Sequence, residues 1–246
     1  MGVIGDSGEK LMIDTQHPNC PDNGLLCFDD WEGIFESQMH DNTTPGKVPC
    51  FLAKLHKAGL RETGSDVQVV VKFVHNYIGT YGKATHEYLY GLGLAPRLYS
   101  ALDLYQGLVM VVMEYLAFQE GSGGWVELDT FEGKLGNMAG AVRKELEKIV
   151  DCLQERGMVH ADLRPKNIMA KVDEQHRITI SEDEPILSVI DFDLAGMVDE
   201  ACYPPFLNPQ VPWPTGTEDY GKVGRNDDRI LLENWWDTFV QPAEPS

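Results

Sequence analysis

The stretch GMVHADLRPKNIM, residues 157–169, concentrates charged and amide side chains in an otherwise apolar setting. Two more such side chains stand in apolar runs elsewhere, Lys72 in VVVKFV and Asp191 in SVIDFD. A carboxylate can accept a proton, carboxylate and amide oxygens can hold a hard divalent cation, and an ammonium group can neutralise an anion. These are the residue types that chemistry on a phosphate group requires.

The first half of the chain must supply the element that carries Lys72. CFLAKLHKAG and DVQVVVKFV predict the two strands of an antiparallel hairpin, and GKATHEYLYGLGLAP predicts a short helix stopped by glycine and proline. LYSALDLY and GLVMVVMEYL predict two further strands. The predicted order is strand, strand, helix, strand, strand, at residues 50–59, 66–74, 82–96, 98–105 and 107–116.

The second half must position the polar stretch. From about residue 138 the apolar residues fall on one helical face until Gly157 ends the helix. They are Val142, Leu146, Ile149, Val150 and Leu153. We expect a flexible joint at GSGG (121–124), a buried strand at LSVIDFD (187–193) and an amphipathic final segment, RILLENWWDTFV. Residues 1–47 are rich in Gly, Asp, Asn and Pro and predict only a loose or partly ordered segment.

The order of four short motifs is more informative than any one of them. VVVKFV, the strand end VVMEYL, HADLRPKN and VIDFD follow one another as in the protein kinase-like fold, which the sequence resembles over about residues 48–215. It is most similar to the small, divergent kinase-like proteins that are numerous in fungi, with which it shares GLAPRLY, DLRPKNI and VIDFDLAG. The resemblance implies an α+β, two-lobed fold with a small β-rich N-lobe and a reduced, mainly helical C-lobe.

The resemblance also implies a division of the chain. The expected parts are a partly ordered leading segment, the N-lobe, the truncated C-lobe and a tail, at residues 1–47, 48–116, 117–240 and 241–246.

By this resemblance the polar residues form a phosphotransfer site with ATP and Mg²⁺ as cofactors. Lys72 would meet the phosphates, and Asp162 would orient an acceptor hydroxyl and take its proton. Arg164 would face the transferred group. Asn167, which also belongs to the catalytic set, and Asp191 would bind the metal ion.

Four residues are expected at the nucleotide or in support of the loop. Glu87 is the one carboxylate of the predicted helix at 82–96 and is the candidate partner of Lys72. Glu114 and Leu116 at the VVMEYL strand end are further cofactor-binding candidates. His160 is implied to brace the catalytic loop.

Three departures weaken the match. No G-x-G-x-x-G precedes Lys72, where Gly46 is the only glycine of the expected strand-turn-strand region. Asp193 replaces the last glycine of D-F-G, and only 53 residues follow it, without an A-P-E element. The expected function is therefore a compact ATP- and Mg²⁺-dependent phosphotransferase with an unidentified hydroxyl acceptor. A small molecule, as in the aminoglycoside phosphotransferase-like branch, and a protein are both open as the acceptor. The alternative is a pseudokinase that acts as a binding or scaffold module.

Composition narrows the partners. Thirty-nine acidic and twenty basic residues give a net charge of -19, which repels nucleic acid. A third interpretation, besides phosphotransferase and pseudokinase, is an unrelated function in which this acidic surface binds a basic protein partner. The longest apolar run, LVMVVM, is far shorter than the roughly 20 residues of a membrane span. The first ten residues, MGVIGDSGEK, have no apolar signal region, so we expect a cytoplasmic location, with the nucleus as the alternative. Five cysteines without a C-x-x-C pair suit reduced thiols in such a compartment. A zinc site built from His17, Cys20 and Cys27 lacks a convincing fourth ligand.

Overall fold

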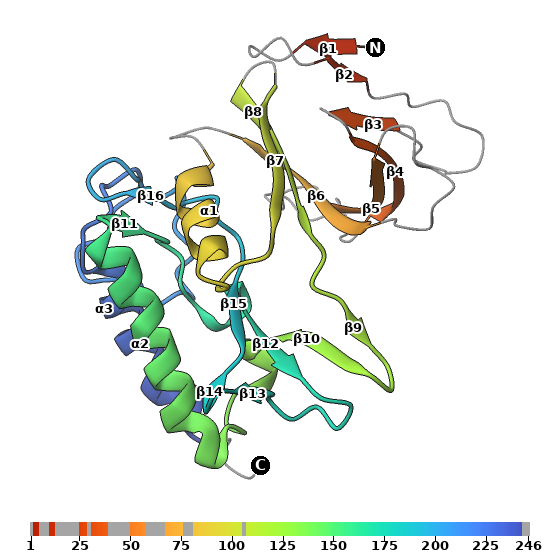
Figure 1. The fold of residues 1–246 in the computed structure, drawn as a ribbon. Coiled ribbons are helices and arrows are strands. Elements are labelled where there is room, and N and C mark those ends of the chain that lie inside the picture. Colours follow the sequence, from red (N-terminus) through yellow and green to blue (C-terminus); the bar gives the residue numbers. More distant parts are fainter. Residues whose placement is uncertain are drawn as a thin grey trace. The chain divides into compact units, whose positions relative to one another are not determined.

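A computed structural model gives the fold of the chain, which divides into two compact units (Figure 1). It describes residues 2–4, 10–12, 25–28, 31–38, 50–57, 67–75, 81–104 and 107–242, with side chains at 50–55, 67–75, 81–104 and 107–242. The first unit comprises Met1–Tyr77 and Arg97–Tyr115, and the second comprises Ile78–Pro96 and Leu116–Ser246. Residues 78–96, which fall inside the expected N-lobe, thus cluster with the second unit.

The first unit contains a six-stranded antiparallel sheet in the order β3-β4-β5-β6-β8-β7. Its strands are β3 Leu25–Phe28, β4 Trp31–Gln38, β5 Cys50–Lys57, β6 Val67–His75, β7 Leu98–Asp103 and β8 Leu108–Glu114. The predicted β5-β6 hairpin and β7-β8 pair are confirmed. A separate pair, β1 Gly2–Ile4 and β2 Lys10–Met12, lies near the N-terminus. The segment 1–47, which was expected to be loose or partly ordered, contributes four strands within its described residues.

Valine-rich β6 is a central strand because β-branched side chains pack well on a pleated sheet. Val69 and Val71 are fully buried and share a hydrophobic cluster with Met110 and Val112 of β8. Since side chains alternate along a strand, Lys72 points to the opposite face from these valines. Its position is fixed by pairing with Cys50 of β5 on one side and Val111 of β8 on the other.

The second unit contains three α-helices and a four-stranded sheet in the order β15-β12-β10-β9. The helices are α1 Lys83–Gly91, α2 Ala139–Glu155 and α3 Asp227–Val240, and the sheet strands are β9 Phe118–Gln119, β10 Gly123–Glu127, β12 Ile168–Val172 and β15 Leu187–Val189. The short elements are β11 Met158–Val159, β13 Ile180–Ser181, β14 Glu184–Pro185, β16 Gly196–Met197 and the 3₁₀ turns η2 Leu128–Phe131, η3 Gly136–Met138 and η4 Pro165–Asn167. Within the described ranges, no helix combines the length and the apolar character of a bilayer span.

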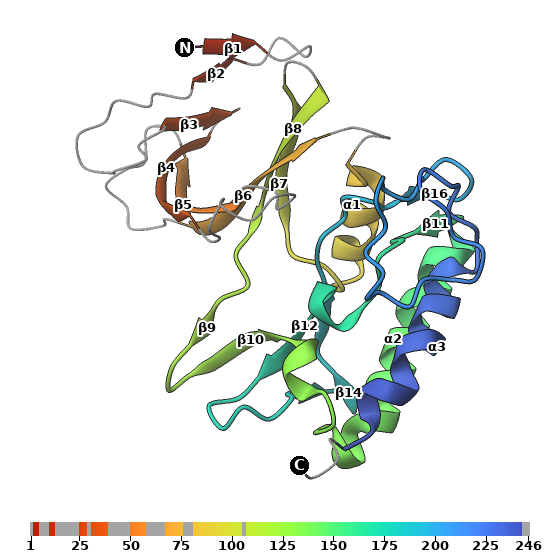
Figure 2. The same ribbon diagram turned by 180° about the vertical axis from the view of Figure 1, so that it is seen from behind.

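Helix α2 follows the prediction closely. All five of its predicted apolar residues are fully buried. Arg156 caps the helix, and Gly157 follows with a φ of +66°, the left-handed conformation that glycine adopts most readily after a helix. Helices α2 and α3 lie side by side in both views (Figures 1 and 2), so α2 delivers the chain to the polar stretch beside α3.

The expectation of a flexible joint at residues 121–124 is wrong. Gly123 and Gly124 belong to β10, with φ values of +79° and +141°. A Cβ atom on Gly123 would lie 2.3 Å from the carbonyl oxygen of Val172, and one on Gly124 would lie 2.3 Å from that of Ala117. These glycines allow close approach of neighbouring backbones in the sheet, which is the opposite of a loose linker.

Candidate active site

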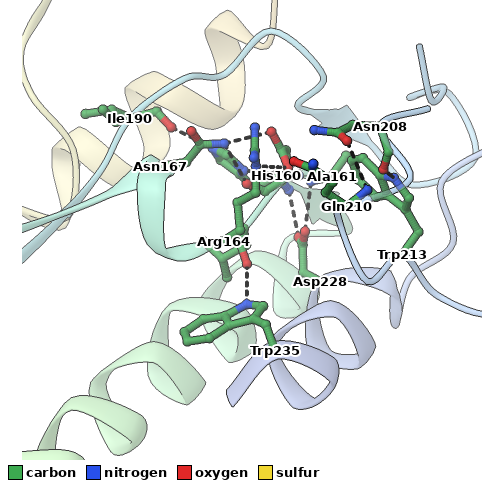
Figure 3. A network of polar contacts seen from close by, with 12 residues as sticks. His160, Ala161, Arg164, Asn167, Ile190, Asn208, Gln210, Trp213, Asp228 and Trp235 are labelled. Atoms are coloured by element: carbon green, nitrogen blue, oxygen red, sulfur yellow. Dashed lines mark hydrogen bonds and ion pairs between the residues drawn. The ribbon is translucent and has the colours of Figure 1, made fainter. Parts of the chain in front are cut away.

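Helix α3 holds the polar loop that follows β11. Asp228, in the first turn of α3 and 2% exposed, accepts two backbone hydrogen bonds (Figure 3): Oδ2 from the His160 N–H at 2.7 Å and Oδ1 from the Ala161 N–H at 2.8 Å. Ala161 has a φ of +67°, which residues other than glycine seldom adopt. The two hydrogen bonds fix the loop in this unfavourable conformation. Trp235 lies about two turns beyond Asp228 on α3. Its Nε1 donates to the carbonyl oxygen of Leu163 at 3.0 Å.

The three predicted catalytic residues lie together on this loop. Asn167 donates from Nδ2 to Oδ2 of Asp162 at 2.8 Å and to the Asp162 carbonyl oxygen at 2.9 Å. Arg164 places Nε 2.8 Å from Oδ1 of Asp162, an ion pair without the alignment of a hydrogen bond. The turn is closed by backbone hydrogen bonds from Arg164 to Asp162 and from Asn167 to Arg164.

Burial raises the pKa of Asp162 to about 6. The charge of Arg164 opposes this rise, the charge of Asp191 adds to it, and the hydrogen bond from Asn167 again opposes it. Asp162 is therefore a carboxylate that is mainly ionised at neutral pH but takes up a proton more readily than an exposed aspartate.

His160 joins the loop to the segment after β15. Its Nε2 lies 3.0 Å from the carbonyl oxygen of Ile190, which can only accept, so Nε2 carries the hydrogen. Nδ1 then accepts from the Asp162 N–H at 3.3 Å. Burial lowers the pKa of His160 to about 4, so the ring is neutral and its tautomer is fixed at physiological pH.

Asp191 lies in this neighbouring segment, beyond the end of β15. The predicted strand at 187–193 stops at Val189 because Asp191 has a φ of +69°, which no strand accommodates. The Ile190 N–H donates to the Asn167 carbonyl oxygen at 2.9 Å, which sets the two segments side by side (Figure 3). Asp191 and Asn167, the two predicted metal ligands, thus come from adjoining backbone.

Phe192 is held between two histidines. The ring of His86, on α1, stacks on it with centroids 4.3 Å apart, and the His160 ring meets it edge-on at 5.1 Å. Nε2 of His86 lies 2.8 Å from the Pro96 carbonyl oxygen and must donate to it, so Nδ1 accepts from the Tyr81 hydroxyl at 2.7 Å. Burial lowers the pKa of His86 to about 4.

Neither Asp228 nor His86 was found from the sequence. Asp228 stands in an Asn-Asp-Asp run before an amphipathic segment, a pattern that also fits an ordinary helix start. His86 occurs in a short helical pattern in which nothing marks it as a contact of Phe192.

The remaining predicted residues are placed as follows. Glu87 lies on α1 with its side chain 57% exposed, and Lys83 Nζ is 4.0 Å away. Lys72 is 7% exposed in the sheet of the first unit, and its pairing with Glu87 stays a prediction. Glu114 ends β8, where Oε2 accepts from the Arg97 N–H at 3.1 Å. Leu116, half-buried, begins the second unit after its boundary with the first.

Comparison with known proteins identifies the architecture. No family model and no curated protein matches the sequence. Among solved structures, the kinase PK-1 of Cydia pomonella granulovirus is similar over 86% of this chain and 68% of its own, with a TM-score of 0.53 and 16% identity. The BubR1 kinase domain is similar over 92% of this chain and 66% of its own, with a TM-score of 0.57 and 14% identity. This chain thus spans about two thirds of the length of each. The likeness confirms the predicted fold class, and the chain has an α+β, protein kinase-like fold with a β-rich N-terminal part and a helix-containing C-terminal part.

Proposed function

We propose that the protein is a phosphotransferase that uses ATP and Mg²⁺ to phosphorylate a hydroxyl-bearing acceptor. The observation that carries this proposal is the group formed by Asp162, Arg164 and Asn167, with Asp191 on the adjoining segment. A protein kinase-like fold makes nucleotide and acceptor binding the natural use of such a group. The acceptor itself is not identified by this geometry.

Asp162 is suited to act as the base. Its Oδ2 accepts from Asn167, whereas Oδ1 faces Arg164 without an aligned hydrogen bond. Because Oδ1 is enclosed against Arg164, an acceptor hydroxyl would reach it only when the Arg164 side chain moves aside. The hydroxyl would then give its proton to Oδ1 as its oxygen bonds to the γ-phosphorus of ATP, the bond from that phosphorus to the β–γ bridging oxygen would break, and ADP would leave. The pKa of about 6 favours this role, because the carboxylate is ionised at neutral pH yet basic enough to hold the proton.

The donor set near Asp191 fits Mg²⁺. Both hydrogen bonds of the Asn167 side chain use Nδ2, so Oδ1 accepts none among the described residues and can serve as a neutral ligand beside the Asp191 carboxylate. The described residues contain no group of three His, Cys, Asp or Glu side chains arranged around a metal. One carboxylate and one amide oxygen suit Mg²⁺, which usually completes its shell with water and substrate phosphates. When bound, the ion would neutralise charge on those phosphates.

The nucleotide contacts are assigned on the resemblance alone. Lys72 would neutralise phosphate charge from β6, where its position on the strand is fixed by pairing on both sides. Glu87 would pair with Lys72, and Glu114 and Leu116 would contribute to the nucleotide site.

A pseudokinase that binds without turnover is the second candidate. Two observations favour it. The sequence between β4 and β5 contains a single glycine, Gly46, and no glycine-rich motif. The side chain of Glu87 is exposed on α1. The segment around Gly46 lies outside the described residues.

Thermal unfolding with ATP and Mg²⁺, together with release of labelled γ-phosphate, separates the two candidates. We expect ATP with Mg²⁺ to raise the melting temperature of the parent protein, because a ligand that binds only the folded state stabilises it. Asp162→Asn should keep that rise but lose about 100-fold or more of the turnover, since it removes the base and not the phosphate contacts. Asp237→Asn, an exposed change on α3, is the matched control.

The outcomes distinguish the candidates clearly. A parent protein that shows no shift with saturating ATP and either Mg²⁺ or Mn²⁺ would be a nucleotide-independent scaffold. A shift without any turnover would indicate a nucleotide-binding pseudokinase. Equal turnover by Asp162→Asn and the parent would remove Asp162 from the proposed role.

A further inference from the structure

Two large aromatic side chains stand in solvent on the segment between β16 and α3. Phe206 is 89% exposed and Tyr220 is 58% exposed, the two highest values among the exposed large hydrophobic residues of the described chain. They belong to neither the Asp162 group nor the Phe192 contacts. Single exposed hydrophobic residues are common, but these two exposed aromatic residues stand on adjoining backbone.

The backbone beneath these rings is well anchored. Tyr203 donates its N–H to the Gly221 carbonyl oxygen at 2.9 Å, and Leu207 donates its N–H to Oδ1 of Asp219 at 3.1 Å. The backbone segments that carry Phe206 and Tyr220 therefore lie next to each other. Further along the loop, Trp213 donates from Nε1 to the Asn208 carbonyl oxygen at 2.9 Å (Figure 3).

Folding does not explain the two exposed rings. Within the same segment Tyr203 is buried in a cluster with Val159 and Val223, where an aromatic ring contributes to stability. Phe206 and Tyr220 make no such contribution at their exposure, and both have left-handed φ values, +58° and +61°. Glycine or asparagine would suit those backbone positions better. The rings are thus present against local backbone preference, with Phe206 almost entirely exposed and Tyr220 more than half exposed.

The charges around the rings define what could cover them. Asp199, Glu200, Glu218 and Asp219 flank the rings in sequence and are exposed. Lys222 is the one basic residue between 196 and 224, and its Nζ already contacts the Glu200 carbonyl oxygen at 3.2 Å. Residues 204–217 carry no charge. A second copy of a chain with a net charge of -19 would meet this surface with like charge, and nucleic acid would do the same.

We propose that Phe206, Tyr220 and the flanking acidic residues form a docking surface for a basic polypeptide, in which arginine or lysine residues flank an apolar side chain. The apolar side chain would cover the rings, guanidinium groups could stack on them, and the outer cations would meet Glu200 and Glu218. This inference does not rest on phosphotransfer. A docking surface of this kind serves an active enzyme and a scaffold equally well.

Fluorescence anisotropy with a defined probe tests the surface. The probe is a labelled peptide of about twelve residues in which arginines flank two central leucines, and we expect a Kd in the micromolar range at low salt that weakens as salt is added. Phe206→Asn and Tyr220→Asn should each weaken binding about 10-fold or more, because each removes an aromatic anchor. Glu218→Lys should weaken it through charge.

The variants carry their own folding control. Asparagine tolerates the left-handed region, so the melting temperature of Phe206→Asn and Tyr220→Asn should stay level or rise. Ile180→Ser, which removes a 51% exposed side chain on β13, is the matched surface control and should bind the probe like the parent. In Figure 1, β13 lies at the other end of the second unit from β16.

Three results would overturn the proposal. The first is the same affinity for the probe in the parent and in both asparagine variants. The second is equal binding of a matched peptide with glutamate in place of arginine, or with serine in place of leucine. The third is self-association of the parent protein that Phe206→Asn abolishes, which would make a second copy the occupant.

Discussion

Replacing Asp228 by asparagine tests how the catalytic loop is held. The parent carboxylate accepts from the N–H groups of His160 and Ala161, and all three residues are buried. Asparagine keeps the shape but has one acceptor oxygen, so its amide N–H₂ faces one of the two backbone N–H groups. We expect Asp228→Asn to destabilise the second unit and to release the loop that carries Asp162.

The size of the effect follows from three contributions. A lost hydrogen bond to a charged group costs about 1.5–3 kcal/mol, and a buried N–H without a partner costs about 1–3 kcal/mol. Against this, burial raises the pKa of Asp228 from 3.8 to about 6, so removing the charge returns roughly 3 kcal/mol above pH 6. Taken at the middle of each range, these contributions give a net loss of about 1 kcal/mol in the free energy of unfolding at pH 7.5.

The sign of the pH dependence adds a second test. A carboxyl group whose folded-state pKa is raised contributes stability that is present below its unfolded pKa and is lost as the pH rises through its folded pKa. The parent loses this contribution between about pH 4 and pH 6, and Asp228→Asn has none to lose. The difference between the two proteins should therefore be larger at pH 5 than at pH 7.5, by about 1–2 kcal/mol.

Urea unfolding followed by tryptophan fluorescence measures both quantities. Four of the five tryptophans, at 125, 213, 235 and 236, belong to the second unit, so the transition reports mainly on that unit. Asp237→Asn should shift the free energy of unfolding by no more than about 0.5 kcal/mol. A variant at Asp228 as stable as the parent, or a difference that is identical at both pH values, would refute the assigned role of the two hydrogen bonds.

Further predictions concern the metal ligand, the base and two glycines. Asp191→Ala should lose most of the rise in melting temperature produced by ATP with Mg²⁺, and a rise that survives would mean that the metal ligand is misassigned. Turnover, where present, should increase with pH through about 6 as Asp162 ionises, and a flat pH profile would argue against it as the base. In urea unfolding, Gly123→Ala should lower the free energy of unfolding by about 2–4 kcal/mol, because its Cβ would meet the Val172 carbonyl oxygen. Gly140→Ala should instead raise it by about 0.5–1 kcal/mol, because its Cβ would have no atom within 4 Å and alanine favours the helix α2.

The elements with regular hydrophobic patterns could be predicted from the sequence. The helical period of α2 and the dense valines of β6 are local signals, and the structure has both elements where the sequence places them. The residues Asp162, Arg164 and Asn167 of the motif HADLRPKN are also neighbours in the structure, because their spacing closes a single tight turn, and their catalytic role stays a prediction.

Features that depend on distant partners could not be predicted. Strand β4 has a weak pattern of its own and becomes a strand by pairing with β5. Asp228 acts on residues 67 and 68 positions earlier, and His86 stacks on a residue far along the chain, so no local pattern points to either. GSGG was misread because flexibility and close backbone approach both favour glycine, and only the neighbouring backbone distinguishes them.

The division of the chain bears on how the protein can be cut into fragments. The backbone passes between the two units three times, after residues 77, 96 and 115, so neither unit is one continuous stretch of sequence. A fragment of residues 116–246 would lack α1 and would expose Phe192, which His86 covers in the intact chain. A fragment beginning at residue 78 would carry β7 and β8 without β6, leaving the β8 edge open to pairing with other chains. Each unit could be produced alone only by joining its two segments directly, without the segment that separates them in the chain, and a single proteolytic cut would leave parts of the two units covalently linked.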